Sequence, residues 1–359
     1  LRVATGYGVA CRIGVDQGNT IAGPARFAYL DLVSEDGGGV SAPLASAEWL
    51  AREYGLGRVL SCTVAARGAM GGIFRLRTTT GAYAAKQFFW QQPDESEVSR
   101  VIAFTTACRK AGVPSPETLA GPRRRFAHEH PATGQSWQVQ RWIQGAVPDR
   151  LDVPTAIWLA QQMATIHRLA LRCDEGAEID PWYLVADHDW LALSDHALAC
   201  NAPWSDGFAS RTSEFAALAT VANSAPSGDV VMCHRDLKAV NTLLEAGGQR
   251  WLLDWDNCGP QESWRELGNL LLHHVGDDSA VAAIADAYQD AGGCAAPRSL
   301  DIFATGLAVW LNFLHGQATL ALDETAEREH RSFAGDEVAA LVDGFPAMQA
   351  LESAAAAWR

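Results

Sequence analysis

Two short stretches contain side chains of the types and spacing that phosphoryl transfer requires: HRDLKAVN at residues 234–241 and WLLDWDN at residues 251–257. Moving a phosphoryl group needs a carboxylate that orients the attacking hydroxyl, one or two Mg²⁺ ions and a cation on the phosphates. Asp236 is expected to be the catalytic base, because it stands in the catalytic-loop pattern of kinases. Asn241, five residues on, and Asp254, at the end of a predicted strand, are expected to be oxygen ligands of Mg²⁺.

The cation on the phosphates is expected to be Lys86, which lies in AYAAKQF on a predicted strand that follows a hairpin. Glu97 lies on the next predicted helix, and apolar residues follow it at one, two and three turns: Val101, Phe104 and Cys108. This spacing predicts that the Glu97 carboxylate shares an inward apolar face and pairs with Lys86. Asp94 and Glu95 are alternative partners of Lys86, or they cap the helix.

A glycine-containing stretch, ARGAMGG, lies between two predicted strands and contains Gly68, Gly71 and Gly72. Successive backbone N–H groups in such a turn can cradle phosphates, which makes Gly71 and Gly72 candidate nucleotide-binding residues. Glycines are also common in strand turns for purely structural reasons, and that interpretation stays open.

The elements around these residues predict a two-lobed α+β protein, with a small antiparallel sheet and one long helix preceding a larger, mainly helical part. Short β-rich runs surround a turn at TTTGAY, and a capped helix follows that ends near Gly112 and Pro114. Beyond Pro154 apolar residues recur mostly at helical spacing. We expect a weakly ordered extension at 1–40, the sheet lobe at 41–145, and the helical lobe with the catalytic loop and acceptor pocket at 146–359.

The charge of the chain is unevenly distributed. The net charge is −14, but residues 1–150 contain 17 basic and 12 acidic side chains, whereas the remainder contains 11 and 30. A mildly basic part suits a polyanionic ligand such as a nucleotide, and a part with a charge of −19 disfavours nucleic acid and attracts cations. Acidity that serves only solubility is the alternative explanation.

Composition also sets limits on location. No window approaches the roughly 20 consecutive apolar residues that span a bilayer, and the amino terminus lacks the pattern of a secretory signal. The eight cysteines include no CxxC pair, which favours small buried hydrophobes in a reducing compartment over disulfides or a zinc site. We therefore expect a cytoplasmic protein with no membrane partner.

The chain from about residue 57 to 340 resembles the aminoglycoside phosphotransferase and choline kinase group, which shares the protein-kinase fold. The resemblance rests on AYAAKQF, RKAGVPSPETL, VQRWIQGAVP, LAQQMATIHRL, HRDLKAVNTLL and LLDWDNCGP. It implies an ATP-dependent enzyme that uses Mg²⁺ and phosphorylates a hydroxyl of a small molecule. It also implies that backbone groups of a connecting strand contact adenine, at Gln140, Trp142 and Ile143.

Two features favour a small-molecule kinase over a serine/threonine protein kinase. About ninety residues separate Ile143 from His234, which leaves room for a helical insert that forms a substrate pocket in the resembled family. Helical periodicity resumes by about Trp264, without the long activation segment and APE motif of protein kinases. The family more often has Gly at the position of Arg235, which is expected here to form an ion pair, with Glu266 as a candidate partner.

The acceptor is expected to be cationic, such as an aminoglycoside, an amino sugar or an amino alcohol. Asp256 and Glu262 are candidates to bind its ammonium groups, and Trp264 is a candidate to stack on a sugar ring. Packing in the core is the alternative role for Trp264, as for three further residues: Trp190, Trp204 and Trp310. A pseudokinase scaffold that binds nucleotide is the non-enzymatic alternative, although the lysine, base and metal residues are all present.

Overall fold

The computed structural model describes residues 44–67, 71–89, 93–173 and 178–357. These residues form two compact units, which we call the sheet unit (44–149 and 239–256) and the helical unit (150–238 and 257–357). The short segment 239–256 therefore belongs to the sheet unit, although it follows the first part of the helical unit along the chain. The predicted extension at 1–40 lies outside the described residues.

The sheet unit is built on a five-stranded antiparallel sheet with strand order β1-β2-β3-β5-β4. Its strands are β1 (Val59–Arg67), β2 (Gly71–Thr78), β3 (Gly81–Phe88), β4 (Ala127–Glu129) and β5 (Ser136–Arg141). The predicted turn at TTTGAY is confirmed, because Thr78 pairs with Gly81 where β2 meets β3. A separate hairpin in this unit consists of β7 (Thr242–Leu244) and β8 (Arg250–Leu252).

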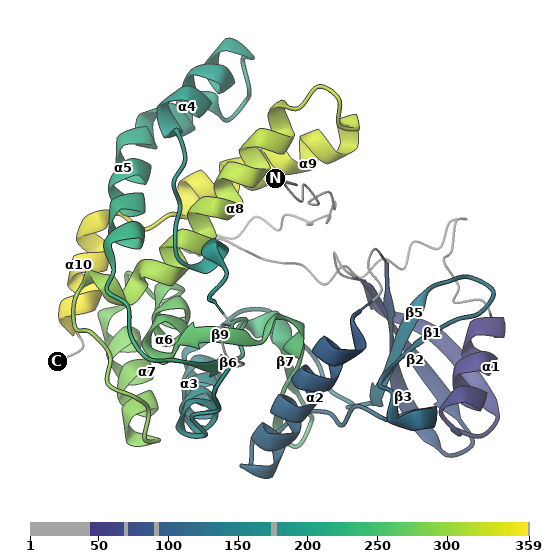
Figure 1. Cartoon of the computed structure of the whole chain (residues 1–359). Coiled ribbons are helices and arrows are strands. Elements are labelled where there is room, and N and C mark those ends of the chain that lie inside the picture. Colours follow the sequence, from purple (N-terminus) through teal and green to yellow (C-terminus); the bar gives the residue numbers. More distant parts are fainter. Residues whose placement is uncertain (1–43, 68–70, 90–92, 174–177, 358–359) are drawn as a thin grey trace. The chain divides into compact units, whose positions relative to one another are not determined.

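Two helices accompany the sheet: α1 (Leu44–Glu53) and α2 (Glu95–Lys110). Side chains of β3 alternate between buried and partly exposed positions, as expected for a strand with one face in the core. Leu50 of α1 packs in one buried cluster with Leu76, Trp137 and Val139 of the sheet, and Figure 1 shows α1 beside the strands. Helix α2 ends as predicted, because Gly112 adopts a φ of +102°, a conformation that favours glycine.

The helical unit is formed by α3 (Val153–Arg168), α4 (Trp190–Ala199), α5 (Ser205–Ser224), α6 (Ser263–Leu272), α7 (Asp278–Asp290), α8 (Ala304–Leu322), α9 (Arg328–Gly344) and α10 (Met348–Ala357). Helix α8 packs against α5, α6 and α9, as Figure 1 shows for α5 and α9. A two-stranded antiparallel sheet of β6 (Val230–Cys233) and β9 (Gly259–Glu262) lies next to α6. The predicted mainly helical composition is confirmed.

Several details differ from the expectation. Helix α1 and strand β9 were not predicted, because each is short and its apolar periodicity covers few residues. Among the described cysteines, Cys200 and Cys294 are exposed, so the prediction of burial fails for these two. Among the described helices, none is long and apolar enough to cross a membrane. The predicted α+β class with a small antiparallel sheet and many helices is confirmed.

The position of α6 depends on a glycine. A Cβ atom at Gly268 would lie 1.5 Å from the backbone oxygen of Ile302, in the 3₁₀ turn Leu300–Phe303. No side-chain rotation relieves a clash with backbone, so only glycine permits this approach.

We predict that Gly268→Ala destabilises the protein by at least about 2 kcal/mol, because overpacking a core against backbone forces the elements apart. Gly316→Ala is the matched control, since Gly316 is exposed on α8 and a Cβ there meets nothing within 4 Å. The control should gain about 0.5–1 kcal/mol from helix propensity. Urea unfolding followed by tryptophan fluorescence measures both, and equal stability of the two variants would contradict the role of Gly268.

Candidate active site

The two predicted metal ligands flank the same hairpin of the sheet unit. Thr242 pairs with Leu252 in the β7–β8 ladder, and the Leu253 N–H donates to the Asn241 backbone oxygen at 2.8 Å. Asn241 therefore lies directly before β7, beside the segment in which Asp254 follows β8. Asp254 adopts a φ of +55°, which is uncommon for a non-glycine residue and occurs often at functional sites. An amide oxygen and a carboxylate form a donor set that suits a hard cation such as Mg²⁺.

Lys86 lies in β3, as predicted, and its ammonium group is directed at the carboxylates that follow β8. Its Nζ atom is 3.3 Å from Oδ1 of Asp254, and it also contacts Oδ2 of Asp256. The side chain of Lys86 is 16% exposed, against 35% for Asp254 and 43% for Asp256. A largely buried cation thus lies between two carboxylates that solvent still reaches.

The predicted inward position of Glu97 was wrong. Glu97 is exposed in the first turn of α2, whereas the next residue, Val98, is buried. One residue corresponds to about 100° around a helix, so an assignment shifted by one position moves a side chain out of the core. Asp94 caps the helix by accepting from the N–H groups of Ser96 and Glu97, as the alternative interpretation expected.

Glu95, the other alternative partner of Lys86, is bound elsewhere. Its carboxylate accepts from Nε of Arg125 at 3.3 Å and from the N–H of Phe126 at 3.3 Å. Within the described part of the chain, Asp254 and Asp256 are acidic partners of Lys86.

The glycines predicted to cradle phosphates open strand β2. Gly71 and Gly72 are buried and pair with Phe88 and Gln87 of β3. A Cβ at Gly71 would lie 2.2 Å from the backbone oxygen of Gln87, so strand packing by itself requires this glycine. Gly68 lies outside the described residues, and phosphate binding by this stretch stays a prediction.

The segment predicted to contact adenine begins at the end of β5. Gln140 donates from Nε2 to Oγ1 of Thr118 at 3.3 Å, and the N–H of Trp142 donates to the Ala82 oxygen at 3.2 Å. The Arg75 guanidinium lies 5.0 Å above the Trp142 ring, which fixes that side chain by a cation–π contact. Ile143 follows in a partly exposed, irregular stretch. Adenine contact by these three residues stays a prediction.

Asp236 lies in the helical unit, in the loop after β6. Its Oδ1 atom is 2.7 Å from Nζ of Lys238, and its Oδ2 atom accepts from Nδ2 of Asn257 at 3.4 Å. The side chain of Asp236 is 17% exposed. The preceding His234 is fully buried, and its Nδ1 atom accepts from the Asp236 N–H at 3.3 Å. The carboxylate is thus held on both oxygens and still reaches solvent.

Arg235 and Glu266 are in contact, but not through the predicted ion pair. Arg235 adopts a φ of +66°, and its backbone N–H donates to Oε1 of Glu266. The guanidinium instead donates from Nε to the Asn257 oxygen at 2.6 Å and lies 4.6 Å from the centre of the Tyr183 ring. Glu266 therefore fixes the backbone of the loop, and the Arg235 side chain contacts other elements.

Glu266 is the centre of a buried hydrogen-bonded group. Its Oε2 atom lies 2.7 Å from Nε2 of His167 in α3, and Nδ1 of His167 lies 2.8 Å from the Tyr288 hydroxyl. Burial disfavours the charged carboxylate, but the bonds from His167 and from the Arg235 N–H outweigh it, so the pKa of Glu266 is lowered. Burial raises the pKa of the Cys233 thiol, which lies 3.5 Å from Nε2 of His167, and that of Tyr288.

His167, Cys233 and Glu266 lie close enough together to ligate a metal ion. The hydrogen bonds already engage both ring nitrogens of His167 and both oxygens of Glu266, which matches a structural network. We therefore assign these residues to support of the catalytic loop.

The residues proposed for acceptor binding have other partners. Asp256 contacts Lys86, as described above. Glu262 is 2% exposed and forms an ion pair with Nε of Arg265 at 2.9 Å, which argues against contact with a soluble substrate. Trp264 is 9% exposed, and the Arg265 guanidinium lies 4.6 Å from its ring. The other tryptophans considered for stacking, Trp190, Trp204 and Trp310, are also buried, so the alternative of core packing is confirmed for them.

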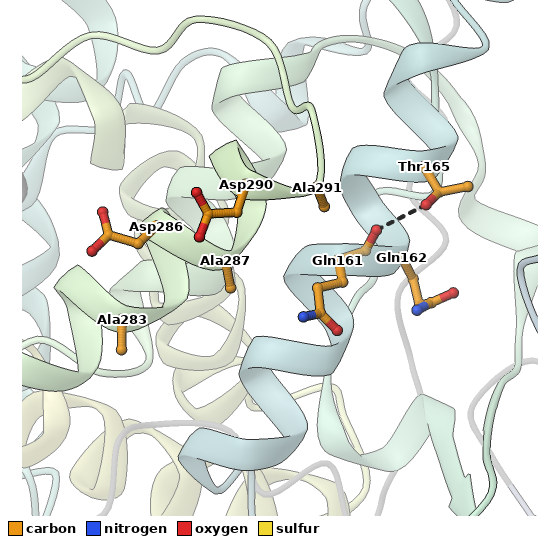
Figure 2. A pocket seen from close by; sticks show the side chains of 8 residues that line it. All are labelled: Gln161, Gln162, Thr165, Ala283, Asp286, Ala287, Asp290 and Ala291. Atoms are coloured by element: carbon orange, nitrogen blue, oxygen red, sulfur yellow. Dashed lines mark hydrogen bonds between the residues drawn. The ribbon is translucent and has the colours of Figure 1, made fainter.

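A surface pocket of about 440 Å³ lies between α3 and α7. Figure 2 shows Asp286 and Asp290 on α7, and Gln161 and Gln162 on α3. None of the predicted site residues lines this pocket.

Three residues of the Asp236 environment were not predicted to be functional: Lys238, Asn257 and Tyr183. Lys238 was within reach of sequence reasoning, because a basic residue two positions after the base is part of the quoted HRDLKAVN string. Asn257 ends the quoted WLLDWDN string, but its contact with Asp236 joins two segments that are separate in the chain, as does the contact of Tyr183 with Arg235, and spacing alone predicts neither.

We predict that Asp256→Asn weakens binding of the ATP analogue Mg-AMP-PNP about two- to fivefold, because partly exposed ion pairs contribute up to about 1 kcal/mol. Glu97→Gln is the control and should leave the affinity unchanged, since Glu97 is exposed on α2. Isothermal titration calorimetry measures both dissociation constants. A loss in Glu97→Gln as large as that in Asp256→Asn would make Glu97 the functional partner of Lys86.

Comparison with known proteins supports the resemblance noted in the sequence. Among solved structures, a spectinomycin phosphotransferase in complex with ADP and spectinomycin is 12% identical, with a TM-score of 0.63 over 82% of this chain and 93% of that chain. A microcompartment-associated aminopropanol kinase is 16% identical, with a TM-score of 0.57 over 84% and 99%. An aminoglycoside phosphotransferase from Alicyclobacillus acidocaldarius is 14% identical, with a TM-score of 0.57 over 87% and 95%.

These three likenesses show that the fold is the protein-kinase-like fold of such enzymes. No curated protein matches the sequence of this chain. Residues 62–303, more than half of the 359 residues, match the model of a family described as the phosphotransferase enzyme family. With that match and this fold, the chain belongs to the phosphotransferase enzyme family and is a phosphotransferase.

Proposed function

We propose that this enzyme transfers the γ-phosphoryl group of ATP to a hydroxyl of a small cationic molecule: an aminoglycoside, an amino sugar or an amino alcohol. The observation that carries the proposal is the environment of Asp236. Its carboxylate is fixed on one oxygen by Lys238 and on the other by Asn257, yet remains 17% exposed. A carboxylate that is oriented and reachable is what a base for an acceptor hydroxyl requires.

The residues of the sheet unit supply the nucleotide side of the proposal. Lys86 is the cation for the phosphates, and Asn241 and Asp254 are the oxygen ligands that would hold Mg²⁺. When bound, Mg²⁺ neutralises charge on the phosphate oxygens. Asp256 would orient Lys86 through the contact between them, which is a role in nucleotide binding and replaces its predicted contact with the acceptor.

In the proposed reaction the acceptor hydroxyl gives its proton to Asp236 while its oxygen bonds to the γ-phosphorus. The bond between the γ-phosphorus and the bridging oxygen breaks, and ADP leaves with that electron pair. Lys238, whose Nζ atom lies 2.7 Å from Oδ1 of Asp236, would fix the orientation of this carboxylate for the proton transfer.

The short segment after Asp254 supports a small acceptor over a protein. Strand β9 ends at Glu262 and α6 begins at Ser263, so fewer than ten residues separate Asp254 from the next helix. A peptide substrate of a protein kinase docks along a much longer activation segment, which this interval cannot hold.

Two observations support a cationic acceptor. The chain after residue 150 has 30 acidic against 11 basic residues, which attracts cations. The similar solved structures include an aminopropanol kinase and an aminoglycoside phosphotransferase, whose names denote amino compounds.

We predict that Asp236→Asn lowers turnover by about 10²- to 10⁴-fold, the usual contribution of a general base, and leaves binding of Mg-AMP-PNP intact. Asp229→Asn is the matched control, because Asp229 is exposed and directly precedes β6, whereas Asp236 follows β6. This variant should retain full turnover. Coupled ADP-release assays measure turnover. Near-normal turnover of Asp236→Asn would remove this residue from the mechanism.

The substrate class is tested by measuring Mg²⁺-dependent ADP release with amino alcohols, amino sugars, aminoglycosides and neutral sugars as acceptors. We predict that a cationic acceptor gives the highest kcat/KM, that EDTA abolishes the activity, and that the acceptor KM rises with salt. Long-range attraction is screened over about 8 Å at physiological ionic strength, whereas close nucleotide contacts are less affected. A neutral sugar or a protein serine as the best acceptor, without salt dependence, would refute the cationic class and leave the kinase proposal intact.

A further inference from the structure

We propose that Arg235 is a positioning residue, which holds Asn257 so that the amide of Asn257 stays on the Asp236 carboxylate. The inference rests on the proposed function insofar as Asp236 is the base. The predicted ion pair with Glu266 does not explain the Arg235 side chain, because Glu266 binds the backbone N–H of Arg235. The catalytic-loop motif does not explain this side chain either.

The backbone conformation at Arg235 favours glycine, so the presence of arginine there needs an explanation. Its φ of +66° lies in the left-handed region that favours glycine, so arginine is disfavoured there relative to glycine. Glu266 enforces this conformation by accepting the Arg235 N–H. A side chain that persists at such a position is expected to contribute something that glycine cannot.

The Arg235 side chain is fixed on three sides. Nε donates to the Asn257 backbone oxygen at 2.6 Å, and the guanidinium lies 4.6 Å from the Tyr183 ring centre. A Cβ at Gly259 would lie only 2.6 Å from Nη2 of Arg235, so the guanidinium occupies space that this glycine leaves free. Oγ1 of Thr305, a buried residue of α8, donates to the Tyr183 oxygen at 2.9 Å and thereby anchors the residue that bears the ring.

Asn257 connects the Arg235 side chain to the proposed base, Asp236. The same residue whose backbone oxygen binds Arg235 donates from Nδ2 to Oδ2 of Asp236 at 3.4 Å. The other carboxylate oxygen, Oδ1, is held by Lys238 at 2.7 Å. Without Arg235, the backbone of Asn257 loses its anchor, and the contact of Nδ2 of Asn257 with the Asp236 carboxylate is weakened.

The test compares Arg235→Gly with Arg124→Gly. Glycine suits both left-handed positions, since φ of Arg124 is +59°, but Arg124 is exposed in the sheet unit outside the proposed site. Arg235→Gly should lower kcat about 10- to 100-fold, as small misplacements of reacting groups do, with KM for ATP unchanged. Arg124→Gly should retain kcat. Thermal unfolding of both variants shows whether any loss of kcat comes from unfolding.

The variant that combines Arg235→Gly with Asn257→Ala tests whether Arg235 affects kcat through Asn257. Asn257→Ala should lower kcat as Arg235→Gly does, and the double variant should be no slower than Asn257→Ala alone, because both remove one interaction with Asp236. Tyr183→Leu removes the ring beneath the guanidinium and should give a smaller loss in kcat. Multiplied losses in the double variant, or normal kcat in folded Arg235→Gly, would overturn the proposal.

The two proposals fail in different ways. If the unmutated enzyme phosphorylates no acceptor in the panel, the proposed substrate class fails. The role of Arg235 is then decided by crystal structures of the unmutated protein and of Arg235→Gly. Asn257 remaining in contact with Asp236 in the variant would overturn it, and loss of that contact would support it.

Discussion

The conformation of the proposed catalytic loop depends on the hydrogen bond from the Arg235 backbone N–H to the buried carboxylate of Glu266. A buried charge costs several kcal/mol unless hydrogen-bond donors surround it, and here the donors come from the Arg235 backbone and from His167. If the loop turned differently at Arg235, the carboxylate would lose its backbone donor. The position of Glu266 depends in turn on α6, which approaches Ile302 closely because Gly268 has no side chain. The orientation of Asp236, the proposed base, therefore depends on how the helices of the helical unit pack.

In the sheet unit, ion pairs hold the charged side chains of the proposed nucleotide site. Lys86 lies between Asp254 and Asp256, so the cation and the carboxylates that are proposed to serve the nucleotide neutralise one another. Their partial exposure keeps the energy of these ion pairs small, which permits Lys86 and the acids to exchange partners when phosphates and a metal bind. A fully buried triad would be held too firmly for this exchange.

Left-handed backbone occurs at a residue of each unit that belongs to, or neighbours, the proposed machinery. Arg235 and Asp254 each adopt positive φ without being glycine, next to the proposed base and at a proposed metal ligand. Such conformations persist only where surrounding contacts compensate for them. At Arg235 these contacts include Glu266 on the backbone, and Asn257 and Tyr183 on the side chain. At Arg235 and Asp254 the uncommon backbone therefore coincides with positions proposed to need precise orientation of side chains.

The sequence by itself determined the family, the α+β fold, the end of α2 and the stretches that contain Lys86, Asp236 and Asp254, because these depend on local spacing, caps and turn residues. Tertiary structure alone decided the partners of those residues. Glu97 is exposed and Asp256 contacts Lys86, while Glu266 binds a backbone N–H of Arg235 and not its guanidinium. Motif spacing shows which residues are available for chemistry, but the partner of a charged group depends on which distant segment offers a donor or acceptor at hydrogen-bond distance, and only the folded chain determines that.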